Sequence, residues 1–92
     1  MTYQLQLFGN PKMVTPTGMN MLERKTAAVL AFLALEGATH KYKLAGWLWA
    51  KSGETAARNN MRQLLRRLRV SVGEVVLGED QIALHPDVNV DV

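Results

Sequence analysis

The sequence predicts an α+β domain in which short strands stand on either side of three helices. Alternating apolar and polar residues near both ends of the chain are typical of strands. The middle of the chain instead holds two apolar segments and one basic segment with the length and spacing of helices. Because 92 residues suffice for one modest core, we expect residues 1–92 to form a single domain.

Short strands are predicted within residues 3–21. Tyr3–Phe8 has the sequence YQLQLF, and its alternation is that of a half-buried strand. Gly9 and the two residues after it interrupt this strand. Lys12–Thr15 and Met19–Met21 are the next two candidates, separated by a turn with the sequence PTG.

Two helices are predicted over about 22–36 and 40–49. The first is apolar almost all round, so we expect it to be central and buried. Gly46 is unusual inside a helix, where it costs up to ~1 kcal/mol relative to alanine, and it suggests close packing against another helix. Trp47 is expected in the core. The second helix has an inward-facing apolar stripe of Leu44, Ala45 and Leu48.

A third helix is predicted over 53–72, after a short turn in which Ser52 is the candidate N-cap. At about 100° per residue its apolar side chains share one face. These are Ala57, Met61, Leu64, Leu65, Leu68 and Val72. The opposite face is polar. Five of the six arginines of the chain lie in this helix, and no acidic residue lies between Arg58 and Arg69.

Residues 74–92 are predicted to form the last β-structure, the wing. Glu74–Leu77 and Gln81–Leu84 have the pattern of a hairpin about the turn Gly78-Glu79-Asp80. Val88–Val92 alternates and predicts one more short strand. A short turn joins the second and third helices, and the third is basic, as in a helix-turn-helix. With the hairpin that follows, the predicted architecture is a winged helix-turn-helix.

The charge of the chain is concentrated in its middle. Residues 40–70 hold eight basic residues and one acidic residue, a net charge of +7. The remainder holds three basic and seven acidic residues, a net charge of −4. A chain polarised in this way has one face suited to a polyanion. The alternative is a plain solvated helix, but such helices usually mix both signs at a spacing of four residues.

The polar face of the third helix has the chemistry of base recognition. Arginine can bind O6 and N7 of guanine together, and asparagine or glutamine can pair with adenine. The predicted base contacts are Thr55, Asn59, Arg62, Gln63 and Arg66. The predicted phosphate contacts are Arg58, Arg67, Arg69, Lys41, Lys43 and Lys51. For Arg24 and Lys25 a contact with the DNA backbone is the alternative, but an ordinary surface role is favoured. The acidic pair Glu79-Asp80 is expected to keep the wing tip from close contact with DNA, because the minor groove is electronegative.

Other function classes find little support in the sequence. The absence of cysteine excludes disulfides and thiolate metal sites, and the two histidines lie far apart, so we expect no metal. No nucleophile stands beside a partnering base and no glycine-rich phosphate loop is present, so we expect neither an enzyme nor a cofactor. Nothing at the N-terminus of the sequence resembles a signal peptide, and the longest apolar run, Ala27–Leu35, is far shorter than the ~20 residues of a membrane span. We therefore expect a cytoplasmic protein without membrane contact.

Five segments spread over almost the whole chain carry a resemblance to a known family. They are LQLFGNPKM, ERKTAAVLAFLALEG, KLAGWLW, ARNNMRQLLRRLR and VLGEDQIALHPDVNVDV. In this order and spacing they resemble the OmpR-type winged helix-turn-helix domain at the N-terminus of SARP-type and related bacterial transcriptional activators.

The resemblance implies a small antiparallel N-terminal sheet against the first helix and a third helix that enters the major groove. It implies that Trp49 reaches a DNA phosphate, although Trp49 could instead fill the core between the helices. The partners it implies are double-stranded DNA, a second copy of the chain on direct or inverted repeats, and RNA polymerase. The expected function is sequence-specific DNA binding by a bacterial transcription regulator.

Two alternatives stay open. The acidic wing and modest net charge fit a protein-interaction module built on the winged-helix scaffold. The second alternative is nonspecific binding of nucleic acid, including RNA. Aromatic residues make up only 7% of the chain, which disfavours the stacking of single-stranded bases on side chains.

Overall fold

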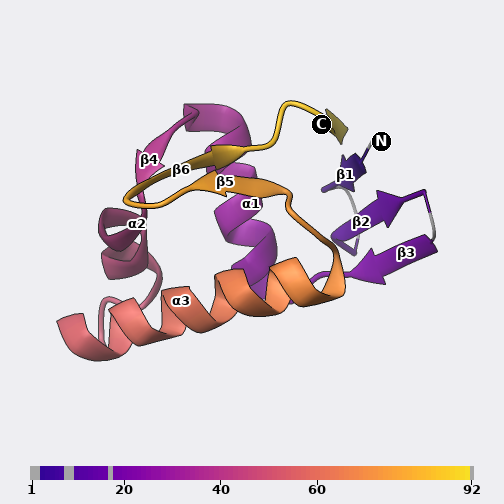
Figure 1. Ribbon diagram of the computed structural model, residues 1–92. Helices are drawn as coiled ribbons and strands as arrows, with labels where there is room; N and C mark the ends of the chain where they lie inside the picture. Colours follow the sequence, from indigo (N-terminus) through magenta and orange to yellow (C-terminus); the bar gives the residue numbers. More distant parts are fainter. Residues whose placement is uncertain (1–2, 8–9, 17, 92) are drawn as a thin grey trace.

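The computed structural model describes residues 3–7, 10–16 and 18–91. Over these residues the chain is a small α+β domain with three helices and two sheets (Figure 1). The helices are α1 (Arg24–Glu36), α2 (Lys41–Leu48) and α3 (Glu54–Ser71). The strands are β1 (Tyr3–Gln6), β2 (Lys12–Thr15), β3 (Gly18–Met21), β4 (Thr39–His40), β5 (Val76–Gly78), β6 (Gln81–Leu84) and β7 (Val88–Asp91). Phe8, Gly9, Thr17 and Val92, which the sequence placed in strands and turns, lie outside the described residues.

The first sheet contains all three N-terminal strands, in the order β3-β2-β1-β7. β1, β2 and β3 pair antiparallel, but β7 runs parallel to β1, with Leu5 opposite Val90. Assigning the C-terminal strand to the wing is therefore wrong, and the sheet is mixed instead of antiparallel. The alternating pattern of β7 was recognisable in the sequence, but such a pattern does not determine which strand is its neighbour. The turn between β6 and β7 is fixed by the N–H of Val88, which donates to the carbonyl of His85 at 2.9 Å.

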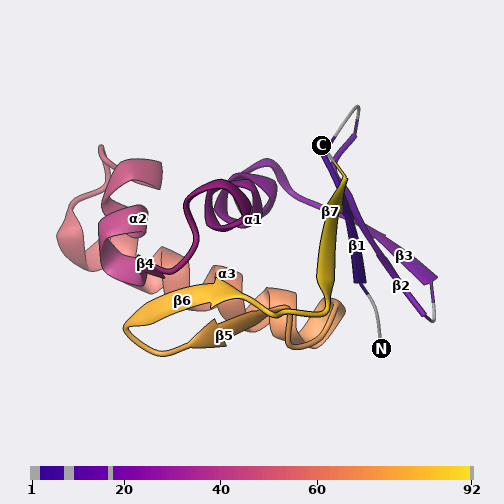
Figure 2. The ribbon, with the colours of Figure 1, turned by 90° about the horizontal axis from the view of Figure 1, so that it is seen from above.

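The second sheet has the order β4-β6-β5 (Figure 2). β5 and β6 form the hairpin, and the two-residue strand β4, which sequence did not predict, pairs antiparallel with β6. The N–H of Lys41 donates to the carbonyl of Asp80 at 2.8 Å, which fastens the hairpin turn to the start of α2. Gly78 has φ 108°, and a Cβ added there would lie 2.0 Å from the carbonyl oxygen of Gln81, so this turn requires glycine.

Two apolar clusters form the core, and α1 and α3 contribute to both. The first comprises Val29, Leu33, Leu44, Ala45, Ala57, Met61, Leu64 and Ile82. The second comprises Leu5, Met13, Leu30, Leu68 and Val75. The apolar circumference of α1 is not fully buried as expected, because Leu35 is 77% exposed. Trp47 is likewise not a core residue. It is 56% exposed and packs edge-on against Phe32, with the ring centroids 5.2 Å apart.

Two further local predictions are wrong. The residue that precedes α3 is Gly53, with φ 84° and ψ 163°, and no side chain caps the helix. Ser52 lies one position too early and its N–H instead donates to the carbonyl of Trp49 at 3.0 Å. Gly46 is exposed, and a Cβ added there would meet nothing within 4 Å, so it serves no close helix packing.

The helix bounds agree with the sequence to within two residues at each end. The arrangement of α2, the turn at 49–53, α3 and the hairpin is compatible with a winged helix-turn-helix. None of the helices in the described part of the chain is both long enough and apolar enough to span a membrane.

Candidate nucleic-acid interface

α3 lies along one side of the molecule, and the other elements lie on its inner side (Figure 1). Its 18 residues make a rod of about 27 Å at 1.5 Å per residue. The buried side chains are Ala57, Met61, Leu64 and Leu68, while Leu65 and Val72 are half-buried. The inner face predicted from helical spacing is therefore correct, and the packing of this face holds the outer face in a fixed orientation.

The outer face of α3 gathers all five side chains assigned to base contacts. Thr55, Asn59, Arg62, Gln63 and Arg66 are all exposed. None of them makes a hydrogen bond or ion pair with another described residue, so their donors and acceptors are open to a ligand. The same face carries Val70, 82% exposed, which sequence reasoning did not single out. An exposed apolar side chain on such a face is suited to contact with a thymine methyl group.

Arg58 differs from the other arginines because it already has partners. Its guanidinium lies 2.7 Å from Oε1 of Glu54 and 4.7 Å from the ring centroid of Tyr42. Both members of the ion pair are exposed, and such pairs contribute about 0.5 kcal/mol. A phosphate could therefore replace Glu54 at little cost, and Tyr42 keeps the guanidinium close to the N-terminal half of α3.

The lysines predicted as phosphate contacts do not share one surface. Nζ of Lys41 lies 5.1 Å from the ring centroid of Tyr42, near the start of α2. Nζ of Lys43 lies 5.5 Å from the ring centroid of Trp47, in a hollow to which α3 contributes no residue. Lys51 is exposed in the turn before α3. Lys41 and Lys51 thus stand near the N-terminal end of α3, whereas Lys43 stands apart from it.

The geometry of Trp49 is compatible with both roles expected for it. Its ring is half-buried and packs against the first core cluster. Its indole N–H has no partner among the described residues, and no polar side-chain atom of those residues is buried without a partner. The N–H is therefore open to solvent and free to donate to an anion, as is common for tryptophans with an apolar body and a polar tip.

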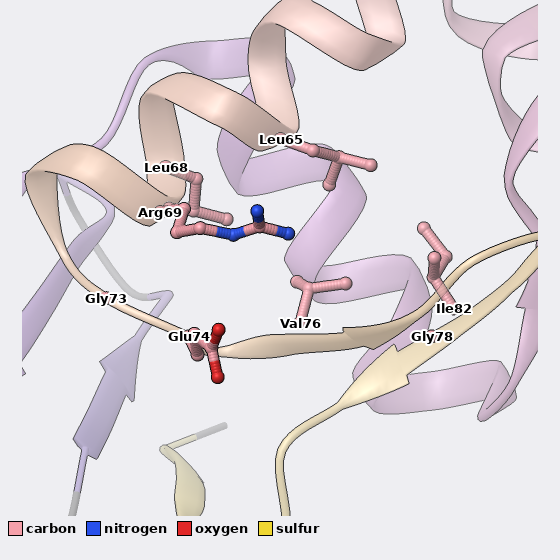
Figure 3. A pocket seen from close by; sticks show the side chains of 8 residues that line it. All are labelled: Leu65, Leu68, Arg69, Gly73, Glu74, Val76, Gly78 and Ile82. Carbon is pink, nitrogen blue, oxygen red and sulfur yellow. The ribbon is translucent and has the colours of Figure 1, made fainter.

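The last two arginines lie on opposite flanks of α3. Arg67 borders a cleft at the start of α1, together with Glu23 and Arg24. Arg69 extends over the space between the end of α3 and β5, with Glu74 on the other side (Figure 3). That space is about 30 Å³, room for one water and too little for an organic ligand.

No protein-family model, no curated protein and no solved structure matches this chain. The chemistry of the interface therefore rests on its residues. A rod-shaped helix that offers amide and guanidinium donors along an exposed face fits a groove lined by base edges and phosphates.

Proposed function

We propose that this chain binds double-stranded DNA in a sequence-specific manner, as the winged helix-turn-helix domain of a bacterial transcription regulator of OmpR type. α3 enters the major groove, which is about 12 Å wide and admits one helix. Arg62 and its neighbours on the outer face read bases, and the flanking cations contact phosphates. Double-stranded DNA is the partner, with a second copy of the chain on repeated half-sites and RNA polymerase as further partners of such a regulator.

The observation that carries this proposal is the division of α3 into two faces. Its inner side chains are buried in the core, while five polar side chains on the outer face lack any partner among the described residues. Between Glu54 and Glu74 the chain has no acidic residue, so nothing on α3 beyond its first residue repels a phosphate. Because the inner face of α3 is packed against the core and its outer face is exposed, the helix can insert into a groove without unfolding or rearranging.

The test is the binding of a labelled random-sequence duplex, followed by fluorescence anisotropy over about 50–200 mM salt. We expect the logarithm of the affinity to fall linearly with the logarithm of salt concentration, with a slope of about −0.9 for each phosphate neutralised. A single strand of the same sequence serves as the control and should bind more weakly. Absence of binding to any duplex at micromolar protein and low salt would contradict the proposal.

A protein-interaction module on the same scaffold is the second candidate. Trp47 and Leu35, 56% and 77% exposed, favour it, because large apolar side chains on a surface often mark protein contacts. It predicts that the chain fails to bind duplex DNA at low salt. The anisotropy measurement therefore decides between the two candidates.

A further inference from the structure

A cleft between the start of α1 and α3 borders the outer face of α3 on one side. α1 contributes Glu23, Arg24 and Lys25, and α3 contributes Asn60, Gln63 and Arg67. The cleft has a volume of about 370 Å³, enough for a phosphate and its adjoining sugar. Gln63 also belongs to the outer face, so the cleft and that face are continuous.

The β5–β6 hairpin borders α3 on the other side. Leu65 and Arg69 face it, and these positions lie on the opposite flank from Asn60 and Arg67. Seen from above in Figure 2, α1 and the hairpin lie beside each other over α3. A helix in the major groove has a sugar-phosphate backbone along each flank, so one backbone faces the cleft and the other faces the hairpin.

The two flanks differ in sign. The cleft combines three cations with the single carboxylate of Glu23. The hairpin, the residues leading into it and the start of α2 bonded to its turn combine Arg69 and Lys41 with the carboxylates of Glu74, Glu79 and Asp80. All three of these acids are exposed, and the hairpin turn is fastened to the start of α2, so it cannot extend away from the domain without breaking a hydrogen bond. Phosphates are attracted by the first flank and repelled by the second.

The arginine side chains of the cleft are available to bind an anion. The side chains of Arg24 and Arg67 are exposed and make no hydrogen bond or ion pair with another described residue. Nζ of Lys25 donates to the carbonyl of Leu48 at 2.9 Å and lies 5.6 Å from the ring centroid of Trp49, which ties α1 to the end of α2. Because α1 and α3 share both core clusters, the backbone positions of the two arginines are fixed relative to each other.

We propose that this cleft is a phosphate-backbone site of the domain, in which Arg24 and Arg67 grip one DNA strand while the hairpin makes no close contact with the other. The inference rests on the proposed DNA binding and assigns Arg24 to the DNA backbone, the role that the sequence disfavoured against an ordinary surface position. Glu23 is the one carboxylate that opposes the grip. The domain thus holds the duplex from the α1 side and not from the wing.

Two carboxylates of the same type provide a matched test, Glu23 in the cleft and Glu79 at the hairpin tip. The affinity for a random-sequence duplex is measured for the parent, Glu23→Gln, Glu79→Gln and Arg24→Ala at several salt concentrations. We expect Glu23→Gln to raise the affinity about 2–5-fold at low salt and Glu79→Gln to leave it unchanged. Arg24→Ala should reduce the salt slope by about 0.9 for one lost phosphate contact. Its effect on affinity should be the same for every duplex sequence.

The opposite pattern overturns the inference while DNA binding stands: Glu79→Gln raises the affinity, and Glu23→Gln and Arg24→Ala leave both affinity and slope unchanged. A parent that binds no duplex overturns the inference together with the proposed function. Circular dichroism and thermal unfolding show whether each variant keeps the parent fold. All three positions are exposed, so we expect each variant to keep the fold, with a loss of at most about 1 kcal/mol in Glu23→Gln because Glu23 is the N-cap residue of α1.

Discussion

Neighbouring residues of α3 illustrate how the helix divides into a buried face and an exposed face. Met61 is fully buried, and its side chain belongs to the first core cluster. Arg62, the next residue, is exposed and has no partner among the described residues. A rotation of about 100° between consecutive residues is enough to move a side chain from the core to the surface.

Met61→Ala should lower the free energy of unfolding by about 2–5 kcal/mol, because it removes buried methylene groups and leaves a cavity. Chemical denaturation monitored by circular dichroism measures the change. Arg62→Ala is the matched control, and we expect it to change the free energy of unfolding by no more than about 0.5 kcal/mol. Equal destabilisation by the two substitutions would show that the faces of α3 are not divided as described.

Gly78 is the residue whose backbone most clearly restricts substitution. Its φ of 108° is unfavourable for residues with a Cβ, and the added atom would also meet the carbonyl of Gln81. Gly78→Ala should therefore destabilise the domain by at least about 1–2 kcal/mol, the cost of a left-handed conformation alone. Thermal unfolding measures this loss, and a melting temperature equal to that of the parent would contradict the geometry of the turn.

At the scale of elements, α2 depends on its surroundings more than α1 or α3 does. It has eight residues, and no side chain caps its N-terminus. An isolated helix of this length is unstable in water, so packing of Leu44 and Ala45 must hold it. Gly46 adds a further cost without a compensating contact.

Gly46→Ala should stabilise the domain by up to about 1 kcal/mol, because Gly46 is helical and exposed and alanine meets no neighbour there. Differential scanning calorimetry is a suitable measurement. Ala45→Gly, one residue earlier and fully buried, is the reverse control and should destabilise. A loss of stability in Gly46→Ala would contradict the open space around Gly46 and would show that a neighbouring group packs against it.

The sequence predicted where helices and strands occur better than it predicted which strands pair with each other. Helical spacing located both faces of α3, because the packing of a long amphipathic helix follows from its own residues. The pairing of β7 with β1 could not be foreseen, since the pattern of a strand is the same in either sheet. Gly53 is the N-cap residue of α3 because of its backbone conformation, which the sequence does not reveal. The serine before it was the stronger N-cap signal in the sequence.

The candidate site was predictable to a similar extent. The outer face of α3 followed from the positions of the arginines, and the side chains of Arg62 and Arg66 make no hydrogen bond or ion pair with another described residue. The cleft beside Arg24 did not, because it forms between helices that are about 40 residues apart in the sequence. Trp47 was expected in the core, but a side chain as large as that of tryptophan is rarely buried completely.

At the scale of the whole molecule, the basic and acidic surfaces lie on different elements, and the core holds these elements in fixed positions. The exposed face of α3 is basic, whereas the hairpin turn is acidic. α1 and α3 each contribute to both core clusters and so fix the basic surface to the rest of the domain. Association with DNA should therefore depend strongly on salt while the fold itself does not.

The central claim is that the outer face of α3 reads DNA sequence, and selection from a randomised duplex pool tests it most directly. The parent domain should enrich a defined motif. Arg62→Ala should still bind but lose the preference at one base position, at a cost of about 1–3 kcal/mol for the preferred base. No enrichment by the parent, or an identical motif selected by both proteins, would contradict the claim.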